Sequence, residues 1–111
     1  PKHFDPVIEG MRRVVNENGG TARMARLEDI VICGKTGTVQ NPQGEDHSVF
    51  IAFAPMNNPK IAIAVFVENA GFGGTWAGPI ASLMIEKYLK RRVTDMAKEK
   101  RILDAILSGG D

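Results

Sequence analysis

The stretch of this chain whose residue types and spacing can do chemistry is Gly34-Lys35-Thr36-Gly37-Thr38. A glycine, a lysine and a threonine in this order also occur in phosphate-binding loops, whose pattern G-x-x-x-x-G-K-[ST] requires another glycine five residues before Gly34. That position is Asp29, whose carboxylate would repel a phosphate. Residues 30–33 are an apolar β-forming run rather than a flexible cradle, so the sequence does not predict a phosphate site.

Two other interpretations of the stretch stay open on the residues alone. It can be a turn or strand with structural glycines, or the K-T-G element of serine enzymes that transfer acyl groups. In the second case Lys35 supplies positive potential beside a serine and supports proton transfer. The hydroxyls of Thr36 and Thr38 can bind a substrate carboxylate, because small hydroxyl groups donate to anions. Gly37 leaves room for the substrate backbone, and the next N–H can point at the developing oxyanion.

The remaining reactive side chains are predicted to have structural roles. Cys33 lies in an apolar run and is expected to be a buried small side chain rather than a nucleophile. His47 opens a strand beside Glu45 and Asp46, and we expect a surface or turn residue because the sequence places no serine or cysteine partner for it. Two histidines and one cysteine make no metal-ligand pattern.

A helix is predicted over residues 4–18, upstream of this stretch. Its apolar residues recur on one face with a 3.6-residue period: Phe4, Val7, Ile8, Met11, Val14 and Val15. Asp5 is expected to cap its N-terminus, with Pro6 at the first helical position, where its missing N–H costs nothing. Gly19 and Gly20 follow the expected end of the helix, since glycine tolerates the left-handed conformation found there.

Three antiparallel strands are predicted over residues 30–67, with the K-T-G stretch in the first. Their expected ranges are 30–40, 47–54 and 61–67, and clusters of Asn, Pro and Gly separate them. Short links of this kind favour a meander. The second strand is apolar on both faces, so we expect both faces to be covered. Ala62 and Ala64 make one face of the third strand small, which suits a helix packed closely on it.

Two more helices are predicted after a glycine-rich loop at residues 68–74. Residues 75–91 are apolar nearly all round over their first part, which indicates a buried helix. Residues 93–107 carry a narrower apolar stripe and are more polar, which is typical of a tail helix on the surface. The expected fold class is α+β: an antiparallel three-stranded meander flanked by helices.

The overall composition is that of one globular domain at most, with 111 residues, 43% of them hydrophobic and 24% charged. The 14 basic and 13 acidic residues give a formal charge of +1, which does not predict a nucleic-acid partner. The single cysteine excludes a disulfide framework. The sequence contains no run of 18 apolar residues that would predict a membrane span.

The motif and its surroundings resemble the C-terminal part of a penicillin-binding protein transpeptidase domain. The resemblance is carried by residues 33–40, Cys-Gly-Lys-Thr-Gly-Thr-Val-Gln, and by residues 47–55, which follow them. The resemblance is most specific to the class B proteins of this family. This narrower resemblance is carried by residues 66–81, from Phe-Val-Glu-Asn-Ala-Gly-Phe-Gly-Gly to Gly-Pro-Ile-Ala. Within that class the chain is most similar to the elongation-type penicillin-binding protein 2, over roughly residues 4–90.

The resemblance implies a role for each residue of the motif. Lys35, Thr36, Gly37 and Thr38 match the third motif of the family. Lys35 and Thr38 would take part in catalysis, and the backbone N–H of Thr38 would form half of the oxyanion hole. The hydroxyls of Thr36 and Thr38, beside Gly37, would hold the carboxylate of a D-Ala-D-Ala stem peptide or of a β-lactam.

The other two motifs of the family are the nucleophile S-x-x-K and the S-x-N, and both lie N-terminal of this region in the family. Neither pattern fits any of the chain's three serines, which are Ser48, Ser82 and Ser108. The chain is therefore expected to be a fragment of one transpeptidase domain. It would hold one wall of the active site without the nucleophile, and it would be inactive alone.

The resemblance implies a parent enzyme that cross-links peptidoglycan stem peptides through a serine acyl-enzyme, and it implies no cofactor and no metal. It implies a periplasmic location at the bacterial inner membrane, with the anchor upstream of this chain. Expected partners are stem peptides, β-lactams and the N-terminal remainder of the domain, with self-association through the strand at residues 61–67. A serine β-lactamase or β-lactam sensor shares the fold and the K-T-G strand and remains an alternative, although the residues after Ala54 argue against it. A non-catalytic binding module is the other alternative.

Overall fold

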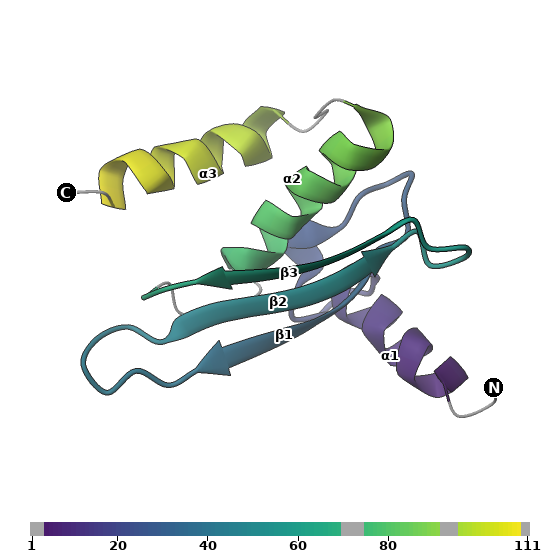
Figure 1. Ribbon diagram of the computed structural model, residues 1–111, viewed down its shortest axis with the longest axis horizontal. Coiled ribbons are helices and arrows are strands. Elements are labelled where there is room, and N and C mark those ends of the chain that lie inside the picture. Colours follow the sequence, from purple (N-terminus) through teal and green to yellow (C-terminus); the bar gives the residue numbers. More distant parts are fainter. Residues whose placement is uncertain (1–3, 70–74, 92–95, 110–111) are drawn as a thin grey trace.

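The chain folds around a three-stranded antiparallel sheet (Figure 1), in a computed structural model that describes residues 4–69, 75–91 and 96–109. Its elements follow one another as α1 (Phe4–Asn16), the short 3-10 helix η1 (Arg23–Ala25), β1 (Cys33–Val39), β2 (His47–Ala54), β3 (Ile61–Val67), α2 (Ala77–Lys90) and α3 (Met96–Gly109). The strands lie in the order β1-β2-β3, which is a meander. The predicted α+β fold class is therefore confirmed.

α1 forms where the apolar period predicts a helix, but its ends differ from the prediction. Asp5, expected at the N-cap, lies inside the first turn because the helix already includes Phe4. An acidic residue is still favoured there, near the positive end of the helix dipole. The helix ends at Asn16, and Gly19 then takes a φ of +84°. Val15 is fully buried whereas Phe4 is 61% exposed, so only the C-terminal part of the apolar face packs in the core.

β1 is shorter than the first strand predicted from the sequence, while β2 and β3 have their predicted bounds. β1 begins at Cys33, and residues 30–32 lie in the link before it. The carbonyl oxygen of Val31 accepts a hydrogen bond from the N–H of Met56 at 2.9 Å, outside the strand ladder. Ile32 is fully buried. Ile32 therefore packs in the core without belonging to a strand, whereas Val31 is exposed.

One face of the sheet is covered by α2, and much of the other face is open. The β2 side chains on the covered face are all buried: Ser48, Phe50, Ala52 and Ala54. On the opposite face Ile51 is 48% exposed and Phe66 of β3 is 54% exposed. The expectation that both faces of β2 are covered is wrong for the described residues. An apolar run shows only that a strand can be buried; a neighbouring element must be present to bury it.

α2 packs on the branched side chains of β3 and not on its small ones. The β3 residues that pack against the core are Ile61, Ile63, Val65 and Val67. Ala62 and Ala64 are exposed on the open face, so the expectation that they face a helix is wrong. The small residues come instead from the helix, where Ala77 and Ala81 are fully buried in the same core. They allow α2 to approach the branched strand closely.

The last two helices lie on one side of the sheet, with α3 beside α2 and in contact with it (Figure 1). α2 is buried along its inner side, but Met84 and Tyr88 are both more than half exposed, so it is not covered all round. α3 ends near the predicted residue; its expected start at Val93 and the glycine-rich loop at residues 70–74 lie outside the described residues. Among the described helices, none is long and apolar enough to cross a membrane.

Candidate functional site

The K-T-G-T motif, residues 35–38, lies in the middle of β1, which is an edge strand. Among the described residues β1 pairs only with β2, so the other edge of its backbone is open. The register places Lys35 opposite Ile51 and Thr36 opposite Phe50. Because side chains alternate along a strand, the lysine and the glycine of the motif belong to the open face. The two threonines belong to the face that carries the core.

All four residues of the motif remain accessible along this strand. Lys35 and Thr38 are exposed, and Thr36 and Gly37 are half-buried. The ammonium of Lys35 donates a hydrogen bond to the carbonyl oxygen of Thr36 at 2.8 Å, which keeps the charge beside the strand backbone. The hydroxyl of Thr36 lies 3.1 Å from the hydroxyl of Thr21, in the link between α1 and η1. The sequence does not predict a role for Thr21, because Thr21 is distant from the motif in the sequence and contacts it only in the folded chain.

β1 is fixed to its neighbours just before the motif. The side-chain amide of Asn16, at the end of α1, donates a hydrogen bond to the carbonyl oxygen of Ile32 at 2.8 Å. Gly34 lies directly against the ring of Phe50, with which a Cβ at this position would collide. The same Cβ would lie 3.0 Å from the carbonyl oxygen of Ile51. Gly34 is therefore required for close packing between β1 and β2.

Gly37 is in a different situation, although it belongs to the same strand. A Cβ at Gly37 would meet only the Cβ of Val49, at the ordinary contact distance of 3.7 Å. Packing of the described residues therefore does not require a glycine here. Its effect is to leave the surface beside Lys35 without a side chain.

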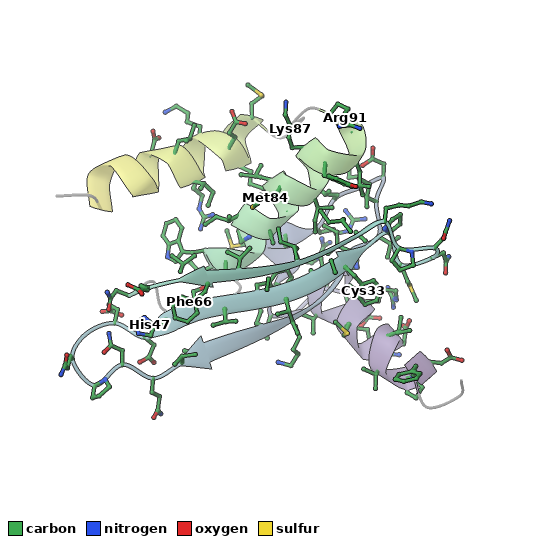
Figure 2. The ribbon with its side chains drawn as sticks, viewed as in Figure 1. Cys33, His47, Phe66, Met84, Lys87 and Arg91 are labelled. Atoms are coloured by element: carbon green, nitrogen blue, oxygen red, sulfur yellow. The ribbon has the colours of Figure 1, made fainter. Side chains whose placement is uncertain are left out.

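Two loops meet beyond the C-terminal end of β1. The backbone N–H of Asn69 donates a hydrogen bond to Nδ1 of His47 at 2.9 Å. The side-chain oxygen of Asn69 accepts a hydrogen bond from the amide of Asn41 at 2.6 Å. The rings of His47 and Phe66 lie together with their centroids 5.3 Å apart (Figure 2). His47 thus has a structural role, and the Asn41–Asn69 pair is one that the sequence does not reveal.

Cys33, Ser48 and Ser82, three nucleophilic side chains away from the motif, are fully buried. Burial raises the pKa of the Cys33 thiol, which disfavours the reactive thiolate. The Ser48 hydroxyl accepts a hydrogen bond from the N–H of Ala77 at 3.2 Å, and the Ser82 hydroxyl accepts one from the Lys98 ammonium at 2.9 Å. Both serines are fully buried. In the described part of the chain, no group of His, Cys, Asp and Glu residues could hold a metal ion.

Ion pairs occur within and between the elements around β1. Within α1, the guanidinium of Arg12 donates to the carboxylate of Glu9, and this hydrogen bond lowers the pKa of Glu9 to about 2. The Lys90 ammonium lies 2.8 Å from the carboxylate of Asp29, which joins the end of α2 to the link before β1. Their hydrogen bond lowers the pKa of Asp29 and raises the pKa of Lys90. Lys90 also lies 3.3 Å from the carboxylate of the buried Glu86.

Most of this chain matches a family of known proteins. The family model described as the penicillin binding protein transpeptidase domain matches residues 1–86. The peptidoglycan D,D-transpeptidase MrdA of Haemophilus influenzae is 36% identical over 86% of this chain and 17% of its own length. The peptidoglycan D,D-transpeptidase PbpA of Mycobacterium tuberculosis is 35% identical over 76% of this chain and 18% of its own length.

A solved structure shows the same arrangement of elements. The crystal structure of Pseudomonas aeruginosa PBP2 in complex with WCK 5153 is similar with a TM-score of 0.72 and 40% sequence identity. The match covers 80% of this chain and 19% of that chain. The chain thus spans less than a fifth of the length of each of these three relatives. The fold, the family model and the relatives agree, and the chain belongs to the penicillin-binding protein transpeptidase domain family, within which it is similar to penicillin-binding protein 2.

Proposed function

We propose that this chain is part of a peptidoglycan D,D-transpeptidase and supplies one wall of its active site. The observation that carries the proposal is the K-T-G-T motif on the open edge of β1, in a chain whose relatives are named peptidoglycan D,D-transpeptidases. Lys35 supplies positive potential at the nucleophile. The hydroxyls of Thr36 and Thr38 bind the substrate carboxylate, and Gly37 leaves room for the substrate backbone.

The hydrogen bond of Lys35 supports the role of Thr38 in the oxyanion hole. The Thr36 carbonyl oxygen accepts from the Lys35 ammonium, as we expect of a carbonyl group at the open edge of β1. In an antiparallel pair, alternate residues turn their backbone N–H and C=O groups to the same side. A Thr36 carbonyl at the open edge therefore goes with a Thr38 N–H at that edge. An N–H in this position can stabilise the negative charge that develops on the substrate carbonyl oxygen.

The nucleophile of the reaction is proposed to come from outside residues 1–111. Ser48 and Ser82 are fully buried, and neither stands in an S-x-x-K setting. In the proposed reaction a serine hydroxyl attacks the penultimate D-Ala carbonyl, and its proton passes to the departing amine of the terminal D-Ala. An amine of a neighbouring stem then attacks the acyl-enzyme, which restores the serine and forms the cross-link. A β-lactam acylates the same serine by opening its ring.

The remainder of the same domain is the proposed partner of the open sheet. Ile51 and Phe66 are about half exposed on one face, and the outer edge of β3 has no strand beside it among the described residues. Apolar surface of this kind is normally covered. We also place the protein on the periplasmic face of the inner membrane, where peptidoglycan is assembled, with its anchor upstream of Pro1.

Covalent labelling with a fluorescent penicillin tests the proposed function. The full-length gene product should gain one label that resists denaturation, and the 111-residue chain alone should gain none. Labelling of the isolated chain, or no labelling of the full-length product, would contradict the proposal. A D-Ala-D-Ala peptide that competes for labelling would support a transpeptidase. Rapid release of the label would instead favour the β-lactamase alternative, and absence of labelling would favour a binding module.

A further inference from the structure

The hydroxyl of Thr21 lies within hydrogen-bond distance of the motif, although Thr21 is not part of it. The oxygen atoms of Thr21 and Thr36 are 3.1 Å apart, and the two residues are 15 positions apart in the sequence. Thr21 comes from the link between α1 and η1, whereas Thr36 lies on β1. The contact therefore brings a second element to the hydroxyl that the proposed function assigns to the substrate carboxylate.

The backbone holds Thr21 in this position from both sides. Before it, Gly20 lies against the last turn of α1, where a Cβ would collide with the carbonyl oxygen of Val14 and lie 2.6 Å from that of Arg13. After it, Ala22 is fully buried, and its N–H donates a hydrogen bond to the carbonyl oxygen of Val14 at 3.0 Å. Thr21 is exposed between these two fixed neighbours, so the fold presents its hydroxyl at a defined place.

The donor capacity of a hydroxyl decides what this contact can do. A threonine hydroxyl has one proton to donate and two lone pairs that accept. Thr36 can therefore give its proton either to Thr21 or to a bound carboxylate, but not fully to both. A hydrogen bond to an anion is the stronger of the two. When a carboxylate binds, Thr36 donates to it and accepts the proton of Thr21, and hydrogen bonds in such a chain strengthen one another.

We propose that Thr21 is a positioning residue for the substrate carboxylate. By donating to Thr36, it turns the proton of the Thr36 hydroxyl toward the carboxylate of a D-Ala-D-Ala stem or of a β-lactam. The inference rests on the proposed function, in which Thr36 binds that carboxylate. It follows that Thr21 contributes only when the substrate carries a free carboxylate.

Two variants of Thr21 separate this role from a structural one. Thr21→Val removes the hydroxyl and keeps the shape of an exposed side chain, whereas Thr21→Ser keeps the donor. The second-order rate constants of acylation are measured on the full-length gene product, with benzylpenicillin and with its methyl ester, whose carboxylate is blocked. Thr21→Val should lower the rate with benzylpenicillin about tenfold, the usual effect of one hydrogen bond. It should leave the rate with the ester unchanged, and Thr21→Ser should restore the rate with benzylpenicillin.

The pattern across the two substrates decides the outcome. An equal loss with both substrates would show a structural role and overturn the inference, as would no loss with benzylpenicillin. If Thr21→Val does not fold, Thr21→Ala is measured in the same way against the same criterion. Failure of the proposed function is distinguishable, because the wild-type full-length product would then be acylated by neither substrate, and both proposals would fall.

Discussion

Two glycines of β1, three residues apart, serve different purposes at the scale of single residues. Gly34 lies against the Phe50 ring, and a Cβ there would also lie 3.0 Å from the Ile51 carbonyl oxygen. Gly34→Ala should therefore lower the free energy of unfolding by about 1–3 kcal/mol, the cost of overpacking a core site. Urea unfolding of the protein measures this change. An unchanged midpoint of the urea unfolding transition would contradict this prediction, because it would mean that β1 and β2 can move apart to accept a methyl group.

Gly37→Ala is the matched variant, because a Cβ at Gly37 would meet only Val49 at 3.7 Å. The same substitution should change the free energy of unfolding by less than about 1 kcal/mol, since it creates no overlap. It should slow acylation of the full-length product, because the methyl group occupies surface that the proposed function leaves for the substrate backbone. Loss of stability without loss of acylation would contradict the role assigned to Gly37.

The Glu9–Arg12 pair gives a prediction about pH. The pKa of Glu9 is lowered from 4.5 to about 2 by the hydrogen bond from Arg12. A carboxyl whose folded pKa lies below its unfolded pKa stabilises the fold above the unfolded value, and this contribution is lost as the pH falls through the folded value. Stability should thus fall between about pH 4.5 and about pH 2, by a small amount because both side chains of the pair remain accessible to water. Glu9→Gln should flatten that part of the pH profile, and an unchanged profile for this variant would contradict the prediction.

The motif could be predicted from the sequence because its four residues are contiguous, so that the chemistry is visible without the fold. Thr21 could not, since its contact with Thr36 depends on how the link after α1 returns to β1. The same holds for Asn69, which reaches His47 and Asn41 only after β2 and β3 have formed. A single sequence carries no signal for such pairs.

At the scale of elements, Arg101 is one of two cations that join α3 to the rest of the fold in the described part of the chain; the other is Lys98, which donates to Ser82. The guanidinium of Arg101 lies 4.7 Å from the centre of the Trp76 ring, and it donates a hydrogen bond to the carbonyl oxygen of Thr75 at 3.1 Å. Arg101→Ala should lower the free energy of unfolding by about 1–2 kcal/mol, because both contacts are lost together. Denaturant unfolding followed by Trp76 fluorescence measures this change.

Lys100→Ala is the matched control on the same helix. Lys100 is 78% exposed in its side chain and pairs only with Asp104 among the described residues, at 3.1 Å. An exposed ion pair of this kind contributes about 0.5 kcal/mol or less. Equal effects of the two variants would show that α3 is not held by Arg101.

The bounds of β2 and β3 could be predicted because the turns beside them are rich in Asn, Pro and Gly, which favour turns. Which faces are covered could not be predicted, because coverage depends on the neighbour rather than on the strand. The alanines that allow close packing between α2 and β3 are in the helix, at Ala77 and Ala81, and those of β3 point to the open face. β1 was predicted too long because an apolar link and an apolar strand cannot be told apart by composition, and residues 30–32 form such a link.

At the scale of the whole molecule, the open face and the open edge of the sheet predict self-association of the 111-residue chain. The open face bears a hollow of about 380 Å³ with largely apolar walls, lined in part by Met11, Ile51 and Phe53. The outer edge of β3 has no partner strand among the described residues. Unpaired edges and exposed apolar surface associate readily.

Light scattering at about 100 μM, a concentration at which exposed strand edges associate, should therefore give a mass above that of a monomer. Ala64→Lys places a charge on the exposed face of β3 and should reduce that mass. Lys60→Ala, in the turn before β3, should leave it unchanged. A monomer mass for the unmodified chain would count against self-association through the open sheet.

The central claim, that residues 35–38 form a wall of a serine acyl-transfer site, is tested most directly by one comparison of rates. The second-order rate constant for acylation by benzylpenicillin is measured on the full-length gene product, on Lys35→Ala and on Lys60→Ala. Both lysines are exposed, so neither change removes core packing. Lys35→Ala should slow acylation about 100- to 1000-fold, as expected for loss of one electrostatic group at a reacting centre. Lys60→Ala should leave the rate unchanged, and a normal rate for Lys35→Ala would contradict the claim.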